Sequence, residues 1–161
     1  MTAMNQAKSL DIRQLLTGHI ADVFHTMLSL DAIPQPKGPL PNFGERITGS
    51  VGFGGDRVNG AMYVHLSIGL AEELACAMLK SAAPQISDTE INDVVGEITN
   101  ILTGQFKSSL SDAGAGCAMS TPAIIRGLSY QIEPSPGVRR ELLLFHCRAK
   151  PMAVEVHIKF N

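Results

Sequence analysis

Two polar residues three positions apart, Glu97 and Asn100, are the strongest candidates for chemistry in this sequence. On an α-helix, residues i and i+3 lie about 60° apart around the axis and about 4.5 Å apart along it, so both side chains point the same way. An asparagine amide can orient a water molecule, because it both donates and accepts hydrogen bonds without carrying a charge. A neighbouring carboxylate can pair with a cation on another molecule. Such a pair suits phosphoryl transfer, in which catalysis is mostly positioning and charge stabilisation.

The segment around this pair has the pattern of an amphipathic helix. Residues 87–90, Ser-Asp-Thr-Glu, form a capping box that predicts the start of the helix. Apolar residues then recur at helical spacing on one side: Ile91, Val94, Val95, Ile98, Ile101, Leu102 and Phe106. The other side carries charged residues, an amide and two glycines: Glu90, Asp93, Glu97, Asn100, Gly104 and Lys107, with Gly96 at its edge.

The two glycines in this predicted helix, Gly96 and Gly104, need a physical reason. Each costs roughly 1 kcal/mol of helix stability relative to alanine. Close approach by another molecule would supply a reason. The alternative is a solvated helix face whose amide and carboxylate only bind water, and the Glu-x-x-Asn spacing by itself leaves this alternative open.

The wider motif resembles the functional helix of the CheC/CheX family of chemotaxis phosphatases. That helix has an acidic residue, then Gly-Glu-x-x-Asn, then Gly and Lys, here Asp93, Gly96, Glu97, Asn100, Gly104 and Lys107. Stretches within residues 23–28, 51–60 and 120–127 are also similar to the family. The first predicted helix, residues 10–30, carries no Glu-x-x-Asn, so the chain resembles the single-site CheX type. Phe106 departs from the small residue expected before the lysine.

The resemblance implies a phosphatase that hydrolyses the aspartyl phosphate of a CheY-like response-regulator receiver domain. Asn100 would position the attacking water, and Glu97 would form a salt bridge with the receiver's active-site lysine. The remaining motif residues would contact the partner: Asp93, Gly96, Gly104 and Lys107. The receiver would carry the phosphoaspartate and Mg²⁺, so this chain would bind no cofactor. The resemblance also implies a homodimer.

Two other functions stay open at this point. The same helix face could serve a non-catalytic module that binds a response regulator or a flagellar-switch component. A CheX-like phosphatase could also act in a two-component pathway unrelated to motility.

Other kinds of site find little support. The three cysteines lie far apart with no C-x-x-C pair, and three histidines stand singly in strand-like segments, at His65, His146 and His157. The glycine-rich segment 49–55 lacks the Gly-Lys-Ser/Thr ending of a phosphate-binding loop and indicates a β-hairpin with a glycine-rich turn. Thirteen basic residues against fifteen acidic ones, with no basic cluster, argue against nucleic-acid binding.

Length and composition predict one domain over residues 1–161, with residues 1–9 as a flexible N-terminal tail. The chain has 161 residues, of which 45% are hydrophobic and 17% charged, enough for one core. The polar start lacks the apolar centre of a signal peptide, and no apolar run approaches the ~20 residues of a membrane span. We therefore expect a cytoplasmic protein.

Hydrophobic periodicity predicts an α+β fold. An amphipathic helix over residues 10–30 is followed by a hairpin over about 47–68, a helix over 70–80, the motif helix and C-terminal strands. The expected strands lie at 128–132, 142–145 and 154–160. The continuous apolar run 142–145 predicts a central strand, whereas the alternating pattern of the last strand leaves its edge position open. The expected architecture is a mostly antiparallel sheet with packed helices.

Overall fold

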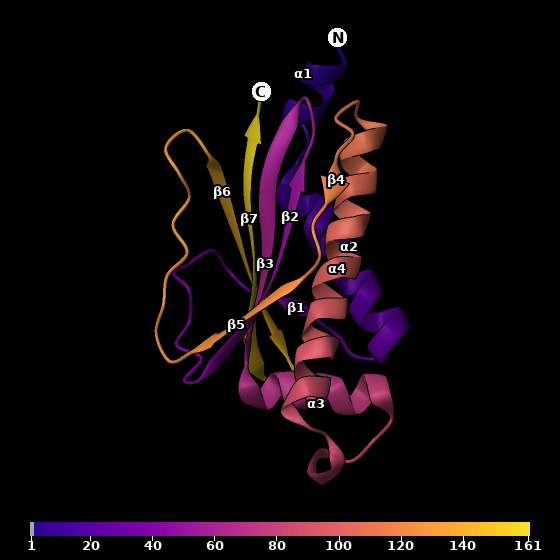
Figure 1. The fold of residues 1–161 in the computed structure, drawn as a ribbon, viewed down its shortest axis with the longest axis vertical. Helices are drawn as coiled ribbons and strands as arrows, with labels where there is room; N and C mark the ends of the chain where they lie inside the picture. The colour runs from indigo at the N-terminus through magenta and orange to yellow at the C-terminus, as the bar shows by residue number, and fades with distance from the viewer. Residues whose placement is uncertain (1) are drawn as a thin grey trace.

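The computed structural model describes residues 2–161 and contains one seven-stranded antiparallel sheet (Figure 1). The strands are hydrogen-bonded in the order β1-β6-β7-β3-β2-β4, and β5 also pairs with β2. Their bounds are Ile33–Pro34 (β1), Arg46–Gly54 (β2), Val58–Ser67 (β3), Ala118–Met119 (β4), Ala123–Gly127 (β5), Arg139–Cys147 (β6) and Lys150–Phe160 (β7). The predicted hairpin corresponds to β2 and β3, which pair along their whole lengths.

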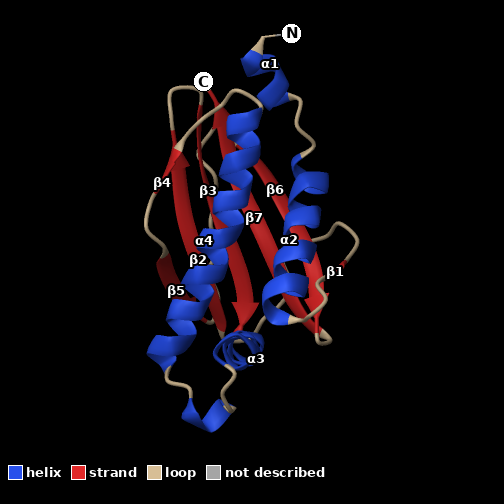
Figure 2. Ribbon diagram, turned by 90° about the vertical axis from the view of Figure 1, so that its right-hand side faces the viewer, coloured by secondary structure: helices blue, strands red, loops and turns tan. Residues whose placement is uncertain are grey.

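The helices are α1 (Ala3–Lys8), α2 (Ile12–Leu28), α3 (Ile68–Leu79) and α4 (Asp88–Asp112), with a 3₁₀ turn η1 (Ala83–Gln85). Figure 2 shows α2 and α4 running side by side over one face of the sheet, with α3 across one end. This arrangement confirms the predicted α+β class. No helix among residues 2–161 combines the length and hydropathy needed to cross a bilayer.

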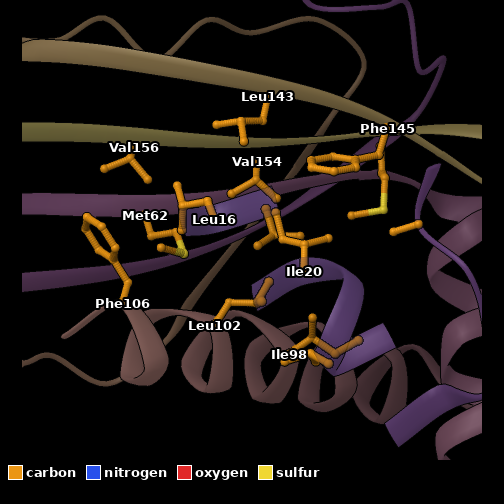
Figure 3. Close-up of a cluster of buried hydrophobic side chains, with 14 of the residues drawn as sticks. Leu16, Ile20, Met62, Ile98, Leu102, Phe106, Leu143, Phe145, Val154 and Val156 are labelled. Carbon is orange, nitrogen blue, oxygen red and sulfur yellow. The ribbon is translucent and has the colours of Figure 1, made fainter. Parts of the chain in front are cut away.

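The core lies between these helices and the sheet (Figure 3). Leu16 and Ile20 of α2 face the apolar side of α4, and both helices pack on side chains from three strands: Met62, Leu143, Phe145, Val154 and Val156. Burying a Leu, Ile, Val, Phe or Met side chain contributes about 1.5–3 kcal/mol. Phe106 belongs to this core and meets the ring of Phe53 edge-on, with 5.7 Å between centroids. The departure from the family pattern at this position is therefore a matter of packing.

Two predicted segments differ from the structure. Residues 128–132 form a loop, and the strand before them is β5. The loop lies on the sheet, where the Tyr130 hydroxyl is 2.5 Å from Thr48 Oγ1. Contact with the sheet on one side explains why apolar and polar residues alternate in this loop as they do in a strand. At the N-terminus, residues 3–8 form α1 instead of a flexible tail. Ala7 is only 1% exposed because α1 packs on the core.

The structure settles the position of the final strand, which the sequence left open, and corrects the central position predicted for the apolar run 142–145. The final strand, β7, lies between β6 and β3 in the middle of the sheet. Its polar residues Glu155 and His157 are buried and hydrogen-bond to each other, which is why the alternating pattern did not reveal its position. The apolar run belongs to β6, which pairs on its outer side with only two residues of β1, so most of β6 is close to a sheet edge.

Candidate functional site

The motif side chains project from one helix, α4. Its first turn is fixed as the capping box predicts, because the Ser87 hydroxyl accepts a hydrogen bond from the Glu90 amide at 3.2 Å. On the helix surface, Glu97 is exposed and Asn100 is half-buried. Within the described residues neither side chain has a hydrogen-bond or ion-pair partner. Both groups are thus presented on the surface of one rigid element.

The charged motif residues flank this pair along the same helix. Asp93 is exposed and Lys107 is half-buried, and neither forms a salt bridge with another residue of the described chain. Asp93 and Glu97 stand at i and i+4, where like charges repel slightly. A cation contributed by another molecule would relieve this repulsion.

A shallow apolar groove adjoins the carboxylates. Met78 and Leu79, at the end of α3, form it with Val94, and its acidic lining consists of Glu90, Asp93 and Glu97. Its volume is about 270 Å³, and Leu79 is 41% exposed. The sequence motif gave no indication of the two α3 residues, because they approach α4 only through tertiary packing.

The two glycines of α4 have different surroundings. Gly96 is buried, and a Cβ placed there would lie 3.4 Å from Pro122 Cβ. This close neighbour belongs to the same chain, and the expected partner contact at Gly96 stays a prediction. Gly104 is half-buried, and a Cβ placed there would meet no atom within 4 Å. Nothing inside the described chain requires a glycine at position 104.

Strand β2 supports α4 directly beneath Glu97 and Asn100. An added Cβ at Gly49 would lie 2.0 Å from Thr99 Oγ1, so only glycine permits this approach of strand and helix. Thr99 is fully buried and donates its hydroxyl to the Val95 carbonyl at 2.7 Å. Because Thr99 precedes Asn100, this contact sets the height and rotation at which the amide leaves the helix.

The segment around β5 clamps the first half of α4. The Arg126 guanidinium donates to Asn92 Oδ1 from Nε at 2.9 Å and from Nη2 at 2.7 Å, and also reaches the Asp88 carbonyl. Pro122, from the same segment, covers Gly96. Residues 120–127 are similar to the family in sequence, but this similarity alone predicts no role for them. Their positioning role becomes visible only once β5 and α4 are neighbours.

Metal binding finds no geometric support in the part of the chain described. No group of three His, Cys, Asp or Glu residues within 2–161 is arranged to hold an ion. Of the three strand histidines, His65 and His157 instead share the carboxylate of Glu155, on the sheet face opposite α4.

The class of this domain is defined by an antiparallel sheet covered by a long helix that presents an acid and an amide. The family model described as "Chemotaxis phosphatase CheX" matches residues 47–146. No curated protein matches the chain. The chain belongs to the CheX family of chemotaxis phosphatases.

Solved structures share the fold. The chemotaxis protein CheX from Vibrio vulnificus is 27% identical, with a TM-score of 0.80, covering 93% of this chain and 97% of that one. CheX from Desulfovibrio desulfuricans is 26% identical, with a TM-score of 0.76 and coverage of 93% and 100%. A CheX-CheY-BeF₃-Mg²⁺ complex from Borrelia burgdorferi is 23% identical, with a TM-score of 0.74 and coverage of 92% and 98%. The similarity therefore extends over nearly the whole chain.

Proposed function

We propose that this protein accelerates hydrolysis of the aspartyl phosphate on a CheY-like receiver domain through Asn100 and Glu97. The observation that carries the proposal is the free, outward presentation of both groups on α4. Side chains that act on a phosphoryl group of another protein must protrude from the surface, whereas a buried pair could not reach that phosphoryl group. Family membership and the Borrelia burgdorferi CheX complex with CheY support a receiver as the partner.

In the proposed mechanism the Asn100 amide accepts a hydrogen bond from water with its Oδ1 and orients the water's lone pair toward phosphorus. The water oxygen forms a new bond to phosphorus in line with the departing aspartyl oxygen, whose bond to phosphorus breaks. The receiver's carboxylate leaves as an anion, and the protons of the water remain on the inorganic phosphate. Glu97 pairs with a lysine of the receiver and fixes the approach. The receiver contributes the phosphoryl group and the Mg²⁺ bound to it, so the chemistry needs no metal on this chain.

Phosphate release from a phosphorylated receiver in Mg²⁺ buffer, with catalytic amounts of this protein, tests the proposal. Wild type should turn over many receivers. Asn100→Ala should abolish acceleration while receiver binding persists, because it removes the water-orienting group and leaves the surface intact. Glu97→Ala should weaken binding, and the difference from wild type should shrink as salt rises, because ion pairs are screened.

A charge-matched control is Glu133→Gln, which removes an exposed carboxylate from a loop outside α4. It should leave both turnover and binding unchanged. Full turnover by Asn100→Ala would contradict the mechanism. Binding without turnover by wild type would instead identify a non-catalytic receiver-binding module.

The proposal includes a homodimer, as the family resemblance implies. Because β7 is interior, its backbone is not available for pairing between copies. On the outer side of β6, β1 pairs with Phe145 and His146, and the carbonyls of Leu144 and Leu142 accept from Gln35 and Arg13. Among the described residues, positions 139–141 have no strand partner on that side, so this end of β6 is the part available for pairing. Light scattering during size-exclusion chromatography tests the assembly, and a monomeric mass at micromolar concentration would remove the dimer from the proposal.

A further inference from the structure

The helix-free face of the sheet carries a cavity of about 650 Å³ that the proposed phosphatase reaction does not use. Its floor consists of sheet residues, and its walls are the loops 38–44 and 128–133. In Figure 1 the β5–β6 connection lies on the left of the sheet, whereas α4 lies on the right. The volume falls within the roughly 300–1,000 Å³ typical of small-molecule sites.

A buried guanidinium lines this cavity. Arg46 is only 4% exposed, and its guanidinium carbon lies 3.6 Å from the centroid of the Tyr130 ring and 5.7 Å from that of Phe43. One nitrogen donates to the Tyr130 carbonyl. No carboxylate of the described chain forms a salt bridge with Arg46. A buried charge without a counter-ion is costly, so the cavity favours an anion beside it.

One of the two carboxylates on the lining, Glu155, already accepts three hydrogen bonds. Its Oε1 accepts from His65 at 3.0 Å, and its Oε2 accepts from Arg140 at 2.5 Å and from His157 at 2.7 Å. These donors leave little capacity for a further cation. The other acidic residue on the lining, Glu133, is exposed and solvated.

A second guanidinium faces the same space. Arg140 uses Nε for Glu155, and its terminal nitrogens have no hydrogen-bond partner among residues 2–161. The lining also includes apolar groups, among them Pro39, Leu40 and Leu142. Two guanidiniums beside apolar and aromatic surface suit a ligand with an anionic head and an organic body, because guanidinium binds carboxylate and phosphate oxygens in a fork geometry.

We propose that this cavity binds a small organic anion, with its carboxylate or phosphate head between Arg46 and Arg140 and its body against Leu142 and the proline-rich loop. The site is separate from the α4 surface because the sheet lies between them. The proposal therefore stands or falls independently of the phosphatase activity.

Calorimetric titration of the full chain with phenyl phosphate, phenylacetate and neutral benzyl alcohol tests the site. At least one of the two anions should bind one-to-one, and the tighter one identifies the head group. Arg46→Met and Arg140→Gln should each weaken this binding by about ten-fold or more, since each removes a charge-assisted contact. Amide chemical-shift changes should fall at residues 40–46 and 128–142 and spare Asn100.

Arg139→Gln is the matched control, because Arg139 precedes Arg140 on β6, pairs with Glu141 and does not line the cavity. It should bind the anion as wild type does. Arg46 also anchors the 128–133 loop, so if Arg46→Met unfolds, Arg140→Gln decides the outcome. Absence of saturable binding by both anions, equal affinity for benzyl alcohol, or unchanged affinity in the folded arginine variants would overturn the proposal.

Discussion

Asn100 carries the proposed chemistry through the position of its amide, and a one-carbon extension tests that idea. Asn100→Gln keeps the amide but displaces it by about one bond length. Because a misplacement of about 1 Å can cost about a hundred-fold in rate, we expect turnover to fall by about that factor while receiver affinity stays near wild type. Single-turnover phosphate release and a binding titration on the same samples measure the two quantities. Wild-type turnover in this variant would show that amide position is unimportant.

Replacing Gly104 with alanine should raise the stability of the protein but weaken its binding to the receiver. Gly104→Ala should stabilise the protein by about 0.5–1 kcal/mol, because the glycine sits inside α4 with open space where a Cβ would lie. If the receiver backbone approaches there, the added methyl group should weaken receiver binding. Urea unfolding and a binding titration check the two effects.

Gly18→Ala provides the matched control, since Gly18 lies inside α2 and also has no atom within 4 Å of an added Cβ. It should give a similar gain in stability with no change in receiver binding. A Gly104→Ala variant that binds and turns over as wild type would show that the partner does not approach this position.

At the level of elements, the contact between β2 and α4 determines how Glu97 and Asn100 are presented. Gly49→Ala would place a methyl group against Thr99, and the two elements must separate to accommodate it. We expect a loss of about 1–3 kcal/mol in stability together with reduced turnover. Thermal unfolding and phosphate release measure these effects.

Gly52→Ala in the same strand separates this effect from strand propensity. An added Cβ there would make an ordinary contact, 3.5 Å from Ser120 Oγ. The stability of the Gly52→Ala variant should stay within about 0.5 kcal/mol of wild type. An equal loss in both variants would mean that the Gly49 and Thr99 contact has no special role.

For the whole molecule, acid sensitivity should come from the buried network on the helix-free face. Burial alone disfavours the charged Glu155 carboxylate, but hydrogen bonds from His65, Arg140 and His157 outweigh it and lower the pKa of Glu155 to about 2. A carboxyl with a lowered folded-state pKa stabilises the fold above its ordinary pKa of about 4.5. This contribution, about 2–3 kcal/mol, is lost as pH falls from about 4.5 toward 2.

His65 also makes the stability of the fold decrease as pH falls, but it does so at higher pH than Glu155. Burial lowers the pKa of His65 despite the opposing effect of Glu155, so the folded state resists the proton that the unfolded state takes up below about pH 6.5. Stability measured by urea unfolding should therefore fall below pH 6.5 and again below pH 4.5. Glu155→Gln should lower stability at pH 7 and flatten the second fall, whereas Glu133→Gln should change neither. A stability profile that stays flat to pH 3 would contradict this assignment.

The sequence by itself determined α4, its polar face and the presentation of Glu97 and Asn100 on that face, because a capping box and helical periodicity are local properties. It also indicated the hairpin and the antiparallel class. Tertiary structure decided which neighbours α4 has: Thr99 rests on Gly49, Pro122 covers Gly96, and Met78 and Leu79 adjoin the carboxylates. It also placed β7 in the middle of the sheet, where Glu155 is buried with its partners. Such contacts join residues far apart in the chain, and they depend on strand order and burial, which no short-range pattern specifies.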